Sequence, residues 1–119
     1  MPEPLYLEEM PEYTPKIVFD VEEGVFEISG DILNDNQSFH DMILDWLKSY
    51  AKSPNACTTF RFYLYYMSDK GWQLVKNMIG ILKTLPDIVI VWQAENEDFK
   101  EHGEELSEEL AFPFKYIVM

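Results

Sequence analysis

A serine and an aspartate stand side by side where a strand-like run gives way to a helical pattern. Ser68-Asp69 follows Thr58–Met67, which is rich in β-branched and aromatic residues, and precedes the helical spacing of Lys70–Leu85. The first N–H groups of a helix lack partners within it, and the helix dipole is positive there. A hydroxyl and a carboxylate at this position are typical of a helix N-cap. The same position suits an anion, including a phosphate on a side chain.

The rest of the chain offers few groups for catalysis or metal binding. His40 and His102 stand alone, without a second ligand at helical spacing or a nearby Cys-x-x-Cys pair. The acidic run Glu95–Glu109 lacks the Asp-x-Asp-x-Asp-Gly loop of a calcium site, and the glycines form no phosphate-binding loop. We therefore predict no enzymatic activity, no metal site and no cofactor. The acidic run is expected to be a solvated helical face or a partner-binding face.

Composition fits one domain with one hydrophobic core. The chain has 119 residues, of which 47% are hydrophobic and 15% aromatic. Its formal net charge is −13, and the acids are concentrated at the two ends of the chain, whereas residues 36–86 have more bases than acids. Because nucleic acids are bound largely by phosphate neutralisation, this charge predicts no nucleic-acid binding. It favours a solubilising surface or a protein partner with a basic face.

The sequence predicts neither a signal peptide nor a membrane helix. Residues 1–13 have neither a basic region nor an apolar run, so no signal peptide is expected. No apolar stretch approaches the roughly 20 residues that a membrane helix needs. The lone Cys57 cannot form a disulfide within the chain, which fits a reduced compartment. We expect a cytoplasmic protein that does not insert into membranes.

The first half of the chain predicts an arm, a hairpin and a helix. Residues 1–15 contain four prolines and are expected to form an extended arm, followed by a single domain over residues 16–119. Lys16–Asp20 and Gly24–Gly30 predict a β-hairpin. A polar connector with three possible N-caps then leads into a helix with one apolar face. The caps are Asn34, Asn36 and Ser38, and the face is Phe39, Met42, Ile43, Trp46, Leu47 and Tyr50.

The second half alternates strands with helices. The density of aromatic and β-branched residues in Thr58–Met67 predicts a central strand covered on both faces. The helix of about Lys70–Leu85 follows, and Asp87–Trp92 predicts a second buried parallel strand. Asp98–Leu110 is a weaker helix, and Phe114–Val118 a last short strand. The predicted order is β-β-α-β-α-β-α-β, an α/β sandwich with a mixed sheet and helices packed on it.

Several segments resemble the SiaC family of regulatory phosphoproteins, over about Met10 to Val118. They are Pro11–Asn36, Met42–Tyr66 and Ile88–Phe114, the last joining a Trp-led acidic segment to a closing Leu-x-Phe-Pro-Phe. The resemblance implies a fold like that of STAS-type anti-sigma-factor antagonists. It also implies a cytoplasmic switch protein in cyclic di-GMP signalling. A kinase phosphorylates such a protein, a phosphatase reverses this, and the unphosphorylated form binds and activates a diguanylate cyclase.

The family's phosphorylated residue is a threonine in an Asn-Thr-Ser-Ser-like segment between strand and helix. Alignment without gaps places Ser68 at the asparagine and Asp69 at the threonine, while Lys70 and Gly71 replace the serines. Either Asp69 is a permanent anion in place of phosphothreonine, or Ser68 is the acceptor. A carboxylate carries about −1, whereas a phosphate carries about −1.5 to −2. The residues expected to contact partners are Lys70, Gly71, Gln73, Lys76 and Asn77.

Two functional hypotheses follow from the sequence. The first is a non-catalytic switch protein that binds a kinase and an output enzyme such as a diguanylate cyclase. The second is an unregulated scaffold subunit in which Ser68-Asp69 is only a helix cap.

Overall fold

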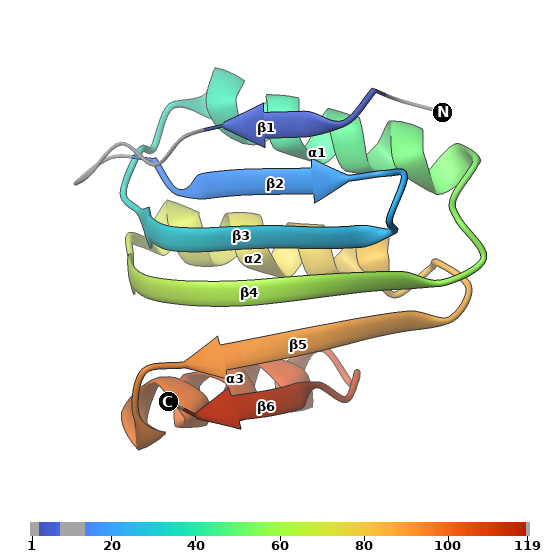
Figure 1. Ribbon diagram of the computed structural model, residues 1–119. Helices are drawn as coiled ribbons and strands as arrows, with labels where there is room; N and C mark the ends of the chain where they lie inside the picture. The colour runs from blue at the N-terminus through green and yellow to red at the C-terminus, as the bar shows by residue number, and fades with distance from the viewer. Residues whose placement is uncertain (1–2, 8–13, 119) are drawn as a thin grey trace.

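The strands of the sheet follow one another in chain order from one edge to the other (Figure 1). The computed structural model describes residues 3–7 and 14–118. This part of the chain forms six strands and three helices. The strands are β1 (Leu5–Leu7), β2 (Lys16–Asp20), β3 (Val25–Ile32), β4 (Thr58–Met67), β5 (Ile88–Ala94) and β6 (Lys115–Val118). The helices are α1 (Gln37–Lys52), α2 (Asp69–Leu82) and α3 (Glu97–Glu109).

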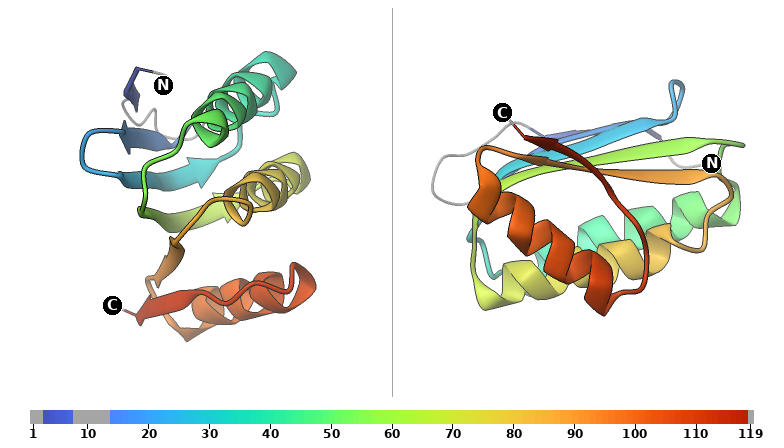
Figure 2. Two further views of the ribbon diagram at one scale, coloured as in Figure 1. Left: turned by 90° about the vertical axis from the view of Figure 1, so that its right-hand side faces the viewer. Right: turned by 90° about the horizontal axis from the view of Figure 1, so that it is seen from below.

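All three helices lie on the same face of the sheet (Figure 2). Strand β1 pairs antiparallel with β2, and β2 pairs antiparallel with β3. From β3 to β6, each strand runs parallel to the next. A helix that joins two parallel neighbours almost always makes a right-handed crossover. Because each crossover advances the sheet in the same direction, each one places its helix on the same side. The predicted α/β sandwich with a mixed sheet is confirmed.

The sheet has one strand more than the sequence predicted. Leu5–Leu7, within the expected N-terminal arm, pairs antiparallel with β2 as the edge strand β1. Leu5 and Leu7 pack against the core, and Tyr6 points to the other face. The observed order is therefore β-β-β-α-β-α-β-α-β. The remainder of the expected arm lies partly in residues 8–13, outside the described residues.

Strand β4 is central, but only one of its faces is covered. Phe60, Phe62 and Leu64 are buried beneath the helices, whereas Arg61 and Tyr63 lie half-buried on the face without helices. The prediction that both faces would be covered is wrong. Long amphipathic side chains cover the sheet with their apolar parts while their polar ends reach water. A high density of aromatic residues therefore did not require a second layer.

The core lies between the sheet and the helices. Its largest fully buried side chains include Tyr50, Phe19, Phe26, Phe60 and Phe62. The Tyr50 hydroxyl is hydrogen-bonded to the Thr58 hydroxyl at 2.8 Å and accepts the Asn55 backbone N–H at 3.1 Å. These bonds satisfy polar groups that burial removes from water.

Each predicted helix is present, and the structure defines the residue at which each one begins and ends. Asn36 caps α1, Ser68 caps α2 and Asn96 caps α3, each by accepting N–H groups of the first turn. Helix α2 ends at Leu82, a few residues before the predicted end near Leu85. Among the described residues, no helix has the length and apolar character needed to cross a membrane.

Candidate regulatory site at the β4–α2 junction

Ser68 is the N-cap of helix α2, and Asp69 is the first residue of that helix. The Ser68 backbone is extended, with φ −70° and ψ 171°, and its hydroxyl accepts the Gly71 N–H at 3.0 Å. Its carbonyl oxygen accepts the Trp72 N–H at 2.9 Å. The hydroxyl therefore satisfies the Gly71 N–H, which has no partner within the helix, and the carbonyl accepts the first i→i−4 bond of α2. Of the two predicted cap residues, the structure assigns the cap to Ser68.

The segment between β3 and α1 lies directly against this junction. Ser68 donates its hydroxyl proton to Asp35 Oδ1 at 2.5 Å, and its backbone N–H to the Ile32 carbonyl at 3.1 Å. Just before the junction, the Tyr66 N–H donates to Asp31 Oδ1 at 3.1 Å. Strands β3 and β4 are parallel, so their carboxyl ends meet at one edge of the sheet. The connections that follow β3 and β4 therefore lie side by side at this edge.

Gly71 brings helix α2 into close contact with the end of β3. A Cβ atom at Gly71 would lie 2.6 Å from the Ile32 carbonyl oxygen, a distance that real Cβ atoms do not reach. The helix can start this close to the strand only because residue 71 has no side chain. The absence of a side chain at residue 71 therefore sets the position of the α2 N-terminus.

Asp69 presents a free carboxylate at the same place. Its side chain is exposed and makes no hydrogen bond or ion pair with any described residue. Asp35 is also exposed, and the described residues supply no cation within ion-pair distance of either group. The junction is thus acidic, and its charge is open to solvent. A carboxylate in the first helical turn is electrostatically favourable because the dipole is positive there.

Helix α2 separates two surface grooves. The groove between α2 and α3 has a volume of about 480 Å³ and is lined by Asp69, Trp72, Gln73, Lys76, His102, Glu105, Leu106 and Glu109. The groove between α1 and α2 measures about 180 Å³ and is lined by Gln37, His40, Leu44, Lys70, Gln73, Leu74 and Asn77. Asp69 therefore stands at one end of the larger groove. A change of charge at Asp69 would therefore act on the lining of this groove.

Four of the five predicted partner-contact residues line these grooves. Lys70 and Asn77 lie in the smaller groove, Lys76 lies in the larger one, and Gln73 borders both. Lys76 forms an ion pair with Glu109 at 2.9 Å, and Gln73 donates to Asn77 at 3.0 Å. Gly71 is buried and sets the helix position instead of presenting a surface.

Sequence reasoning missed three residues of this region. Asp35 lies in the polar connector and has no sequence signal of its own, and Trp72 lies within the predicted helix Lys70–Leu85 without a candidate role. His102 stands alone in the sequence, and its ring lies 5.8 Å from the Trp72 ring, measured between centroids. His40 is buried, and its Nε2 contacts the Asn34 carbonyl at 2.6 Å. No sequence spacing relates Asp35 to Ser68, because the contact depends on the pairing of β3 with β4.

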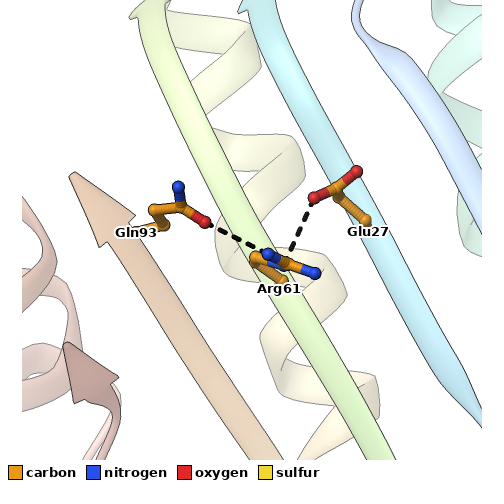
Figure 3. Close-up of polar contacts among 3 residues, drawn as sticks. All are labelled: Glu27, Arg61 and Gln93. Carbon is orange, nitrogen blue, oxygen red and sulfur yellow. Dashed lines mark hydrogen bonds and ion pairs between the residues drawn. The ribbon is translucent and has the colours of Figure 1, made fainter. Parts of the chain in front are cut away.

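The face of the sheet without helices carries a separate polar strip (Figure 3). Arg61 on β4 forms an ion pair with Glu27 on β3, with 3.2 Å between Nε and Oε1. Its Nη1 donates to Gln93 Oε1 on β5 at 3.3 Å. The strip links the three neighbouring strands β3, β4 and β5, and its residues line neither groove. Its charges neutralise each other, so it carries no site comparable to the junction.

The fold and the junction define a two-layer α/β domain that presents a capped, acidic helix N-terminus at the carboxyl ends of parallel strands. The chain belongs to the SiaC family: the profile described as "SiaC family regulatory phosphoprotein" matches residues 8–119. Comparison with curated proteins gives no match.

Solved structures with the same fold include SiaC of Pseudomonas aeruginosa. A chain in the crystal structure of the diguanylate cyclase SiaD with its activator SiaC superposes with a TM-score of 0.85 at 20% identity, covering 97% of this chain and 99% of that one. SiaC of the same organism gives a TM-score of 0.82 at 16% identity, with 98% of each chain covered. Apo-SiaC gives 0.77 at 16% identity and the same coverage. At identities this low, the superpositions show the shared fold alone.

Proposed function

We propose that this chain is a non-catalytic regulatory protein whose binding to protein partners is controlled by negative charge at the Ser68-Asp69 junction. The observation that carries the proposal is the free, exposed carboxylate of Asp69 at the end of the α2–α3 groove. Family membership supports it, since the family is described as regulatory phosphoproteins. The chain would act in the cytoplasm, with its partners recognising the grooves on either side of α2.

Two chemical forms of this control are compatible with the junction. In the first, Asp69 is a permanent anion at the position of the family's phosphorylated threonine, and the protein needs no kinase. In the second, Ser68 accepts a phosphoryl group. Its Oγ attacks the γ-phosphorus of ATP, the bond from that phosphorus to the bridging oxygen breaks, ADP leaves, and a base takes the hydroxyl proton. A phosphatase would restore the hydroxyl by hydrolysis.

The proposed output partner is a diguanylate cyclase. SiaC is the activator of the cyclase SiaD in the structure that superposes on this chain. By family resemblance, the form of the switch protein without phosphate binds the cyclase. A fixed anion at Asp69 would therefore weaken cyclase binding, and its removal would strengthen it.

Incubation with the kinase of the same genome and ATP, followed by mass-spectrometric mapping, separates the two forms. Stoichiometric phosphate on Ser68 would establish the acceptor and exclude the permanent-anion form. Absence of phosphate, together with a cyclase affinity that depends on Asp69, would establish the permanent anion. Absence of phosphate, together with a cyclase affinity that does not change on substitution of Ser68 or Asp69, would contradict the proposal.

The alternative function is an unregulated scaffold subunit. One observation favours it: Ser68 does cap the helix by accepting the Gly71 N–H at 3.0 Å. A residue that only caps affects the free energy of unfolding, by about 0.5–2 kcal/mol, and leaves partner affinity unchanged. The two functions therefore differ in which measurement responds to a substitution at the junction.

A further inference from the structure

We propose that Asp35 senses the chemical state of Ser68 and transmits it to the N-terminus of helix α1. The inference rests on the proposed function in one respect, namely that Ser68 can carry phosphate. The contact that carries it joins Ser68 Oγ to Asp35 Oδ1 at 2.5 Å, across 33 residues of sequence. Asp35 belongs to the connection between β3 and α1, whereas Ser68 belongs to the junction between β4 and α2.

The Ser68 hydroxyl both donates and accepts a hydrogen bond in its unmodified state. A serine hydroxyl has one proton to donate and two lone pairs that can accept. Its proton goes to Asp35, and one lone pair accepts the Gly71 N–H at 3.0 Å. Asp35 is therefore held by a proton that only the free hydroxyl possesses.

A phosphate ester at Ser68 reverses the sign of this contact. The ester oxygen has no proton to donate, and the phosphate adds a charge of about −1.5 to −2 beside the Asp35 carboxylate. Asp69 follows directly in the chain, and Asp31 is engaged nearby by the Tyr66 N–H. The only basic residue adjacent in sequence is Lys70. Like charges at contact distance repel, so Asp35 must move away from the junction.

The displacement of Asp35 reaches helix α1 through the next residue. Asn36 is the N-cap of α1, and its Oδ1 accepts the Ser38 N–H at 2.8 Å and the Phe39 N–H at 3.3 Å. On the other side, the Asn34 carbonyl contacts His40 Nε2 at 2.6 Å. Movement of Asp35 therefore loosens the first turn of α1. That turn supplies Gln37 and His40 to the α1–α2 groove, so the state of Ser68 changes a partner-binding surface.

The test uses phosphoserine introduced at position 68 during translation, so that no kinase is needed. Amide hydrogen exchange is measured by NMR at Ser38 and Phe39, whose N–H groups are held by the Asn36 cap. We expect phosphoserine to accelerate exchange at both amides at least tenfold over the unmodified protein. In an Asp35→Asn background the acceleration should fall below twofold, because an amide side chain can donate to the phosphate. Asp45→Asn, an exposed α1 residue, is the charge-matched control and should retain the full acceleration.

Two results would overturn the inference. One is phosphoserine 68 that leaves the exchange of both amides unchanged. The other is equal acceleration in the wild-type and Asp35→Asn backgrounds, which would assign the effect to the loss of the Ser68 cap alone. Neither result bears on whether a kinase or a cyclase binds the chain. Failure of the proposed function would appear in the phosphorylation and affinity measurements instead, so the two failures are distinguishable.

Discussion

Gly71 and Ile32 are in such close contact that residue 71 has no room for a side chain. A Cβ atom there would lie 2.6 Å from the Ile32 carbonyl oxygen and 3.2 Å from Ile32 Cγ2. The same carbonyl accepts the Ser68 N–H at 3.1 Å. One backbone group at the end of β3 therefore fixes both the cap and the first turn of α2. The geometry of the β4–α2 junction depends on this contact.

Substitution of Gly71 by alanine should destabilise the protein. A methyl group would be forced against a backbone oxygen that cannot rotate away, and overpacking of this kind costs about 1–3 kcal/mol. Gly80 lies in the same helix and is the matched control, since nothing lies within 4 Å of its Cβ position. Gly80→Ala should stabilise by up to about 1 kcal/mol through helix propensity. Urea unfolding followed by circular dichroism measures both; equal effects at the two positions would contradict the close contact.

Loss of the Ser68 cap should lower stability more than loss of the neighbouring carboxylate. Ser68→Ala removes the acceptor of the Gly71 N–H, which should cost about 0.5–2 kcal/mol of unfolding free energy. Asp69→Ala removes only an exposed first-turn charge, so its melting temperature should stay within about 3 °C of wild type. Thermal unfolding of the two variants provides the comparison. A larger loss for Asp69→Ala would show that the cap is assigned to the wrong residue.

The buried hydroxyl of Tyr50 should contribute measurably to stability. Tyr50→Phe leaves the Thr58 hydroxyl and the Asn55 N–H without the partner they now share. An unsatisfied buried polar group costs about 1–3 kcal/mol. Tyr66→Phe is the matched control, because Tyr66 is 67% exposed and should tolerate the loss of its hydroxyl. If chemical denaturation gives the same free energy of unfolding for Tyr50→Phe and Tyr66→Phe, the hydrogen bonds of Tyr50 are not stabilising.

The ion pair between Glu27 and Arg61 should contribute little. The two side chains are 25% and 41% exposed, so solvent and salt screen their attraction. A double-mutant cycle with Glu27→Gln and Arg61→Met should give a coupling of about 0–1 kcal/mol that decreases with added salt. A coupling above about 2 kcal/mol would mean that this strip is shielded from water, which the bare sheet face does not provide.

The elements that could be predicted are those with a local signal. The hairpin after Lys16, the periodic face of α1 and the apolar run of β5 each have a pattern within one segment. Strand β1 has only three residues, and it forms because the edge of β2 supplies its hydrogen bonds. A pattern within one segment cannot show such dependence on a distant neighbour.

The same limit applies to the β4–α2 junction. Ser68 and Asp69 could be singled out because they stand between a strand pattern and a helix pattern. Which of them caps the helix depends on the backbone at Ser68, and the sequence favoured both equally. Asp35 could not be found at all, since its contact with Ser68 requires that β3 and β4 pair in parallel and end together.

The central claim is that charge at the junction controls partner binding, and titration calorimetry against a diguanylate cyclase from the same genome tests it directly. We predict that Asp69→Asn, which removes the fixed anion, raises cyclase affinity at least tenfold, about 1.4 kcal/mol, with little change in melting temperature. Asp45→Asn removes the same charge from α1 and should leave the affinity unchanged. If instead a cyclase that binds the wild-type chain binds Asp69→Asn with the same affinity, and phosphoserine at position 68 also has no effect, the junction is a helix cap and the switch does not exist.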